Sequence, residues 1–205
     1  LYWQYLVGGD GFYISPDKDN SRFGYGTSQN GNLYRYDKIT GYYQSISPNA
    51  KDIKTPLRFN WNAGFAEDPF DNNGIYYGSQ FLHKSKDKGA NWDTISPDLT
   101  TNKSEYQKND YGGLTLDISG AENYTSILSI APSHLDENII WIARCSMYGG
   151  VQDAQGYEVF KSVDGGQNWI NITTSTLDNI NATNIVHQRG SNGGVYIGTR
   201  ESVYY

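Results

Sequence analysis

The sequence predicts an all-β fold built from repeated four-stranded antiparallel units, and three observations lead to that prediction. The octet S-x-D-x-G-x-x-W occurs twice, at residues 85–92 and 162–169, each time between two short apolar runs. Tyr, Trp, Ile and Val occur with frequent Gly, Asn, Asp and Ser, the mixture of short strands joined by turns. No segment shows a helical hydrophobic period over a dozen residues. A strand–turn–strand sequence that returns in the same context indicates a repeated supersecondary unit.

Each octet has the residue types of a hairpin turn. The Ser hydroxyl and the Asp carboxylate can accept backbone N–H groups within the turn. The Gly supplies a positive φ, and the Trp begins the return strand with a large ring to bury against the next sheet. We therefore interpret these positions as structural, and expect both Trp rings to be buried between sheets. They are Ser85, Asp87, Gly89 and Trp92 in the first octet, and Ser162, Asp164, Gly166 and Trp169 in the second.

The first unit spans residues 5–48, with strands expected at 13–14, 22–26, 33–36 and 42–46. Residues 33–48 align without a gap with residues 82–97, an offset of 49. Tyr43 then takes the place of Trp92, and residues 37–41 form the turn of a degenerate octet. An offset near 50 residues fits one four-stranded blade of a β-propeller.

Three further units follow. The second covers residues 58–97, with strands at 59–65, 75–78, 82–84 and 92–95. The third covers residues 124–173, with strands at 127–131, 139–143, 157–161 and 169–172. The fourth, 183–205, is partial, with strands at 184–187, 195–198 and 202–205. About three and a half blades are too few to close a ring. We therefore expect residues 1–205 to form a partial β-propeller domain of a longer chain.

The octet is the Asp box, also called the bacterial neuraminidase repeat, and the chain resembles the Asp-box β-propellers. The sequence around it narrows the resemblance. The segments RFNWNA at 58–63, IYYGSQ at 75–80 and ISPDLTTN at 95–102 are similar to large secreted bacterial proteins with sortilin-type propellers. Those proteins are often labelled glycosyl hydrolase-like. The resemblance covers nearly the whole chain, and it is more specific for the fold than for an activity.

Two insertions break the regular spacing, at residues 100–123 and 145–156. In an antiparallel meander, successive connections alternate between the two ends of the sheet, which places both insertions at one end and the octets at the other. Long loops at one end of a rigid scaffold are where binding sites are usually built. We therefore expect binding through Tyr111, Tyr148 and Asp153 in the insertions, with Arg58 and Trp61 deeper in the central channel.

Composition excludes several classes of protein. The net charge of −6 and the pI near 5.0 argue against a nucleic-acid partner, which would require a basic patch. No apolar stretch approaches the length that spans a membrane, so we expect no membrane insertion. Neither the single cysteine nor the scattered His83, His134 and His187 suggests a metal site, and we expect no cofactor.

A glycosidase needs two carboxylates that flank the bond it cleaves. The candidates are Asp10, Glu67, Asp68, Asp110, Asp117, Glu122, Asp153 and Glu158, and no motif pairs any two of them. Asp10 and Asp117 are of most interest, although Gly-Asp-Gly around Asp10 is also turn chemistry. The arginine-bearing motif of Asp-box sialidases does not occur in this sequence.

Three functions follow from this reading. The first is a secreted or cell-surface recognition module that binds protein or polysaccharide at the insertion-bearing face. The second is an endo-acting glycoside hydrolase whose acid pair lies partly outside residues 1–205. The third is a scaffold subunit of a surface assembly. The resemblance implies a bacterial protein that is extracellular or at the cell surface, with the periplasm as the alternative. It also implies that further parts of the same chain are a partner of this domain.

Overall fold

The computed structural model describes residues 3–50, 54–104, 125–145, 158–177, 182–199 and 201–205, without the side chain of Cys145. These residues form fifteen strands in four antiparallel sheets and no α-helix. The all-β, antiparallel prediction is therefore confirmed. In each sheet, neighbouring strands follow one another along the chain, as in a meander.

The first two sheets each contain four strands. Sheet A consists of β1 (Gly11–Pro16), β2 (Phe23–Ser28), β3 (Asn32–Asp37) and β4 (Tyr42–Ser45). Sheet B consists of β5 (Phe65–Glu67), β6 (Ile75–Gly78), β7 (Leu82–Ser85) and β8 (Asp93–Thr94).

The remaining strands form a four-stranded and a three-stranded sheet. Sheet C consists of β9 (Ser126–Pro132), β10 (Ile140–Cys145), β11 (Glu158–Ser162) and β12 (Ile170–Asn171). Sheet D consists of β13 (Ala182–His187), β14 (Val195–Thr199) and β15 (Val203–Tyr204).

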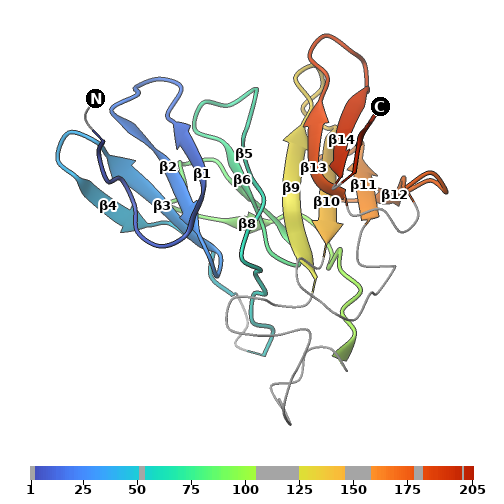
Figure 1. Cartoon of the computed structure of the whole chain (residues 1–205), viewed down its shortest axis with the longest axis horizontal. Helices are drawn as coiled ribbons and strands as arrows, with labels where there is room; N and C mark the ends of the chain where they lie inside the picture. Colours follow the sequence, from blue (N-terminus) through green and yellow to red (C-terminus); the bar gives the residue numbers. More distant parts are fainter. Residues whose placement is uncertain (1–2, 51–53, 105–124, 146–157, 178–181, 200) are drawn as a thin grey trace.

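The sheets follow one another face to face across the molecule, and a hydrophobic core fills each space between neighbours (Figure 1). Tyr25 and Leu33 of sheet A meet Phe65 and Tyr77 of sheet B. The core between sheets B and C contains Tyr76, Leu82, Leu99, Ile127, Ile130, Ile140 and Ile142. That between sheets C and D contains Ala131, Trp141, Ala143, Val159, Leu177, Ala182, Ile185 and Ile197. Alternating side chains thus bury both faces of the inner sheets.

One hydrogen-bond pattern recurs at the third strand of sheets A, B and C. The N–H groups of Leu33, Leu82 and Val159 donate to hydroxyls of Ser47, Ser96 and Thr173, at 2.8, 2.8 and 3.0 Å. The carbonyls of the same three residues accept from the N–H groups of Ile46, Ile95 and Ile172, each at 2.9 Å. The offsets of 49 and 77 residues therefore match equivalent positions in space.

The structure corrects three expectations about individual residues. Strand β5 begins only at Phe65, so Trp61 precedes a strand instead of lying in one. Gly64 marks the change: its carbonyl still accepts the N–H of Gly78 in sheet B at 2.9 Å, but its N–H donates to the carbonyl of Ile127 in sheet C at 3.0 Å. Trp92 and Trp169 are half-buried, because each ring lies near the outer edge of its inter-sheet core.

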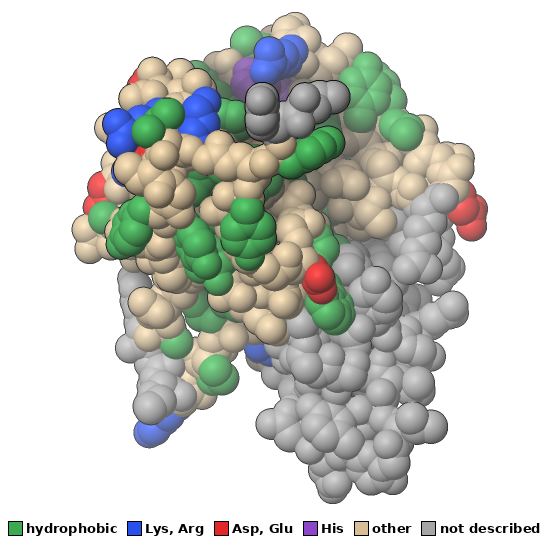
Figure 2. All heavy atoms as spheres, turned by 60° about the vertical axis from the view of Figure 1, so that its left-hand side comes forward, with side chains coloured by type: hydrophobic (Ala, Val, Ile, Leu, Met, Phe, Trp, Pro, Cys, Tyr) green, Lys and Arg blue, Asp and Glu red, His purple; other side chains and the backbone are tan. Residues whose placement is uncertain are grey.

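Val7 packs against Gly26 on the outer face of sheet A, and the rest of this face, like the outer face of sheet D, carries exposed side chains. Exposed hydrophobic side chains on these faces include Phe12, Ile14 and Tyr43 in sheet A, and Val186, Tyr196 and Val203 in sheet D. Figure 2 shows such side chains gathered over the sheet A side of the molecule. The alternation that buries one side of these sheets thus leaves a second apolar side against solvent.

Candidate functional site

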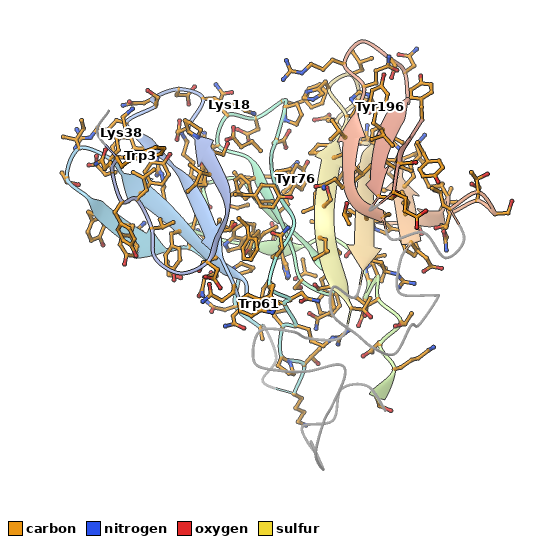
Figure 3. The ribbon with its side chains drawn as sticks, viewed as in Figure 1. Trp3, Lys18, Lys38, Trp61, Tyr76 and Tyr196 are labelled. Atoms are coloured by element: carbon orange, nitrogen blue, oxygen red, sulfur yellow. The ribbon has the colours of Figure 1, made fainter. Side chains whose placement is uncertain are left out.

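The described residues that flank the two predicted insertions lie at one end of sheet C. Arg144 near the end of β10 pairs with Glu158 at the start of β11, and Cys145 pairs with Ser126 at the start of β9. The hydroxyls of Thr101 and Thr125 lie 3.3 Å apart, which joins the two sides of the longer insertion. We call this the insertion end, and the opposite end, which carries residues 85–92 and 162–169, the octet end. Figure 3 shows Trp61 at the insertion end and Lys18 at the octet end, with Tyr76 between them.

Arg58 organises the insertion end of sheet B. Its Nη2 donates to Oγ1 of Thr100 at 2.6 Å and to Oδ2 of Asp98 at 3.2 Å. Its Nη1 donates to Oδ1 of Asn102 at 3.2 Å. A guanidinium that holds a carboxylate, a hydroxyl and an amide together fixes the direction of residues 98–102.

Two buried side chains hold the same segment from its other sides. Gln80 accepts the N–H of Arg58 at 2.8 Å, and its backbone carbonyl accepts the N–H of Leu99 at 3.0 Å. Arg144, only 6% exposed, donates from Nη1 to the carbonyl of Leu99 at 2.6 Å and forms an ion pair with Glu158. Its guanidinium also lies over the Phe160 ring, 5.0 Å from the centroid. Residues 98–102 therefore have a fixed position between sheets B and C.

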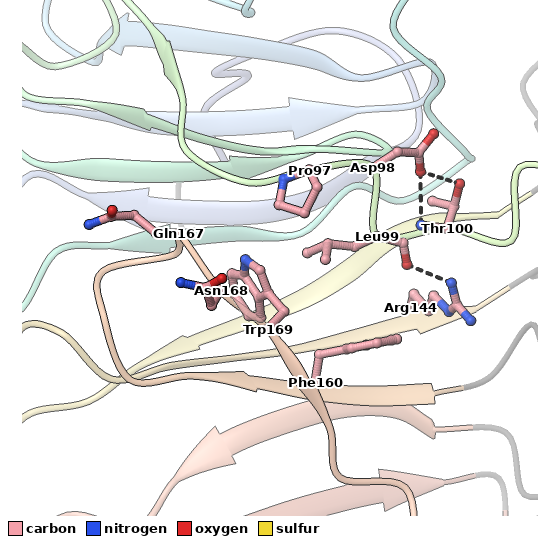
Figure 4. Close-up of a pocket in the computed structure, with 9 residues that line it drawn as sticks. All are labelled: Pro97, Asp98, Leu99, Thr100, Arg144, Phe160, Gln167, Asn168 and Trp169. Atoms are coloured by element: carbon pink, nitrogen blue, oxygen red, sulfur yellow. Dashed lines mark hydrogen bonds between the residues drawn. The ribbon is translucent and has the colours of Figure 1, made fainter.

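A cavity of about 390 Å³ lies beside this segment, between sheets B and C (Figure 4). Pro97 and Leu99 form one wall, and Trp169 and Phe160 form the other. The two ends of the cavity are lined by Gln167 and Asn168, and by Asp98, Thr100 and Arg144. The volume lies within the range of about 300–1,000 Å³ that is usual for small-molecule sites.

At the octet end, the two octets form the same hydrogen bonds. Oγ of Ser85 accepts the N–H of Gly89 at 2.8 Å and donates to Asp87 at 2.8 Å. Oγ of Ser162 accepts the N–H of Gly166 and donates to Asp164, both at 2.9 Å. Each Asp also accepts the backbone N–H and the side-chain amide of an Asn, namely Asn91 and Asn168. These Asn hydrogen bonds lower the pKa of both carboxyls below its ordinary value.

Other carboxylates at the octet end are neutralised by cations. Asp68 lies 2.7 Å from Nζ of Lys84 and 3.1 Å from the Tyr76 hydroxyl. Burial alone would raise the pKa of Asp68, but the hydrogen bonds from Lys84, the Phe70 N–H and Tyr76, with the charge of Lys84, together outweigh it, so that the pKa is lowered. Burial raises the pKa of Tyr76 to about 12. Glu67 likewise faces Lys18 at 3.6 Å. Asp68 is thus tied to β7 of its own sheet, and Glu67 of β5 to the β1–β2 connection of sheet A, so a catalytic role for either would require breaking an ion pair.

Only some of the predicted site residues fall within the described part of the chain. Arg58 and Trp61 lie at the insertion end, and Asp10 is an exposed residue just before β1, with its N–H donating to Gln29 at 2.9 Å. Tyr111, Asp117, Tyr148 and Asp153 lie outside the described residues. Sequence reasoning did not single out Gln80, Asp98, Thr100 or Arg144 as site residues. The ISPDLTTN segment at 95–102, which the family resemblance had pointed to, contains two of them, Asp98 and Thr100.

Among the described residues, no three His, Cys, Asp or Glu side chains are grouped so that they could hold a metal ion. The same residues include no helix that is long and apolar enough to cross a membrane.

No family model matches the sequence, and no curated protein matches it. Solved structures do resemble it. An ancestral GH74 enzyme gives a TM-score of 0.58 at 21% identity, over 98% of this chain and 24% of that enzyme. The GH74 enzyme of Niastella koreensis gives 0.51 at 19% identity, over 94% and 27%. YCF48 bound to D1 peptide gives 0.52 at 12% identity, over 99% and 52%.

These structural neighbours are β-propeller proteins, and the chain has the fold of part of a β-propeller. It spans about a quarter of the length of the two GH74 enzymes and about half of YCF48. At identities between 12 and 21%, the likeness concerns the fold alone.

Proposed function

We propose that this chain is part of a secreted or cell-surface recognition module of the sortilin-type Asp-box family, and that it binds protein or glycan at the insertion end. The observation that carries the proposal is the fixed segment 98–102, which Arg58, Gln80 and Arg144 hold between two sheets. Such a pre-positioned support lowers the entropy that a binding loop must lose when it engages a ligand. The two identical octet turns support the family assignment.

The structural neighbours support both ligand classes at a coarse level. YCF48 was solved with D1 peptide bound, and the GH74 enzymes are glycoside hydrolases. Tyr111, Tyr148 and Asp153 in the insertions, together with Trp61, would supply aromatic surface and orienting polar groups. An endo-acting glycoside hydrolase that uses Asp10 or Asp117 remains the alternative, and a scaffold subunit of a surface assembly is the third.

We also propose that further sheets of the same chain cover the outer faces of sheets A and D. Both faces carry exposed aromatic and β-branched side chains, among them Ile14 at 50% and Val203 at 71% exposure. The inner faces of the same sheets carry fully buried apolar residues, such as Leu33 at 0% and Ile185 at 2% exposure. A bacterial extracellular or cell-surface location remains part of the proposal, by resemblance.

The test exchanges residues 105–123 and 146–156 for short Gly-Ser linkers, singly and together. The matched control replaces the connection at residues 69–73, at the octet end, with the same linker. All proteins are checked by circular dichroism and thermal unfolding, and then applied to a glycan array and a peptide array. We expect the double exchange to lose its ligand at least tenfold, with the control unchanged. Equal binding by a folded double exchange would place the site elsewhere.

A further inference from the structure

The two octets differ in where the Trp indole donates its hydrogen bond. Nε1 of Trp92 crosses to the preceding sheet and donates to the carbonyl of Ile46 at 2.7 Å. Nε1 of Trp169 instead donates to the carbonyl of Gly166 in its own turn, at 2.8 Å. Ile46 and Ile95 are equivalent positions, and both pack on the octet glycine. The first indole therefore bridges sheets A and B, whereas the second turns back and borders the cavity between sheets B and C.

The walls of this cavity are apolar and aromatic. Phe160 and Trp169 are half-buried and pack against the core between the two sheets, while Pro97 is exposed at the opposite wall. Exposed Gln167 and Asn168 stand at one end. Their amide nitrogens donate to Asp164, with the carbonyl as acceptor for Gln167 and the carboxylate for Asn168. That use of the nitrogens holds both amides in place, and the oxygen of each amide remains an acceptor.

The charges beside the cavity are compensated within the protein. Arg144 is held by Glu158, by the carbonyl of Leu99 and by the face of Phe160. The carboxylate of Asp98 is held by Arg58 and by the hydroxyl of Thr100 at 2.5 Å. A phosphate or carboxylate ligand would therefore find no net positive charge, and an ammonium ligand no net negative charge.

We propose that this cavity binds one ring of a neutral glycan. A pyranose presents C–H groups that pack on aromatic rings, together with hydroxyls that donate to amide oxygens. The lining offers these complementary groups and no net charge. The proposal rests on the proposed function, and it names a glycan as the ligand and the space between sheets B and C as a subsite outside the insertions.

The test blocks the cavity at its exposed end. Gln167→Trp adds a large side chain there, and Ala90→Trp adds the same side chain at the equivalent, exposed position of the first octet. Pro97→Tyr blocks the opposite wall, so that a folding failure of one variant does not decide the result. Each protein is titrated calorimetrically with cellotetraose, mannotetraose and, as the acidic counterpart, tetragalacturonate. Thermal unfolding is measured alongside.

We expect at least one neutral tetrasaccharide to bind the unaltered protein, at least tenfold more tightly than tetragalacturonate. Gln167→Trp and Pro97→Tyr should weaken that binding tenfold or more, and Ala90→Trp should leave it unchanged. Equal affinity of Gln167→Trp and Ala90→Trp would overturn the subsite, as would tighter binding of the acidic sugar or no binding of either neutral one.

The same proteins separate this inference from the proposed function. If ligand binding is lost on exchange of the insertions but unaffected by Gln167→Trp, the recognition function stands and the cavity proposal is overturned. If Gln167→Trp abolishes neutral glycan binding and exchange of the insertions does not, the cavity proposal stands and the function at the insertion end falls.

Discussion

The two octets are alike in their turns and different in their surroundings. Both use a Ser hydroxyl to accept the N–H of the octet glycine and an Asp to accept two hydrogen bonds from an Asn. The indole of Trp92 nevertheless bonds to sheet A, and that of Trp169 to its own turn. Local residue chemistry thus determines the turn, while the sheet in front determines what the ring contacts. A repeat can therefore keep its fold and vary the space between its sheets.

The largest expected effect separates the two Trp side chains. Trp92 packs in the core between sheets A and B, with its ring centroid 6.4 Å from that of the fully buried Tyr77. We expect Trp92→Ala to lower the free energy of unfolding by about 3 kcal/mol, through lost contacts and the lost indole bond. Trp169→Ala should cost roughly half of that, because one side of its ring faces a cavity.

Urea titration of both variants measures this difference. Phe substitutions at the same two positions serve as controls, since they keep a six-membered aromatic ring while removing the indole donor. Equal losses for Trp92→Ala and Trp169→Ala would show that the bridge to Ile46 contributes nothing beyond packing, and the comparison would lose its physical basis.

The next effect concerns the octet glycines. Gly89 and Gly166 have φ values of +90° and +99°, where an L side chain is strained. A Cβ on Gly89 would lie 2.5 Å from Cδ1 of Ile46, the mobile end of a side chain, whereas one on Gly166 would lie 3.0 Å from the backbone oxygen of Ile95. We expect each Ala substitution to cost about 2 kcal/mol, with Gly166→Ala the larger because a backbone oxygen moves less easily.

Gly41→Ala provides the control for this pair. Its φ is +73°, but a Cβ there would meet no atom within 4 Å, so only the backbone strain remains. We expect it to cost roughly 1 kcal/mol in the same urea titration. A loss at Gly41 as large as at Gly166 would mean that the contact with sheet B adds nothing to the strain.

The contrast between local and distant partners explains which features the sequence could predict. The octet turns and the antiparallel meanders follow from residues close together in the chain, and they were predictable. The partners of Arg58 lie 40 to 44 residues away, at Asp98, Thr100 and Asn102. The indole acceptor of Trp92 is 46 residues away. No local pattern encodes such pairings, nor the bond from the Gly64 N–H to sheet C at the point where the predicted strand around Trp61 gives way to a shorter one.

The smallest expected effect tests the feature that the octets share. Hydrogen bonds from Asn91 to Asp87, and from Asn168 to Asp164, lower the pKa of both carboxyls in the folded protein. A lowered pKa stabilises the fold above the ordinary carboxyl pKa of about 4, and this contribution is lost as the pH falls through the folded value. Asp87→Asn and Asp164→Asn should therefore each reduce stability at pH 7 by a similar amount, and the gap to the unaltered protein should close below about pH 4. Urea titrations at pH 7, 5 and 3 measure both trends.

Because the two turns are far apart in the chain and have matching hydrogen bonds, the double variant should show the sum of the single losses. A loss at one octet without a loss at the other would show that the preceding sheet acts on the turn as well as on the ring.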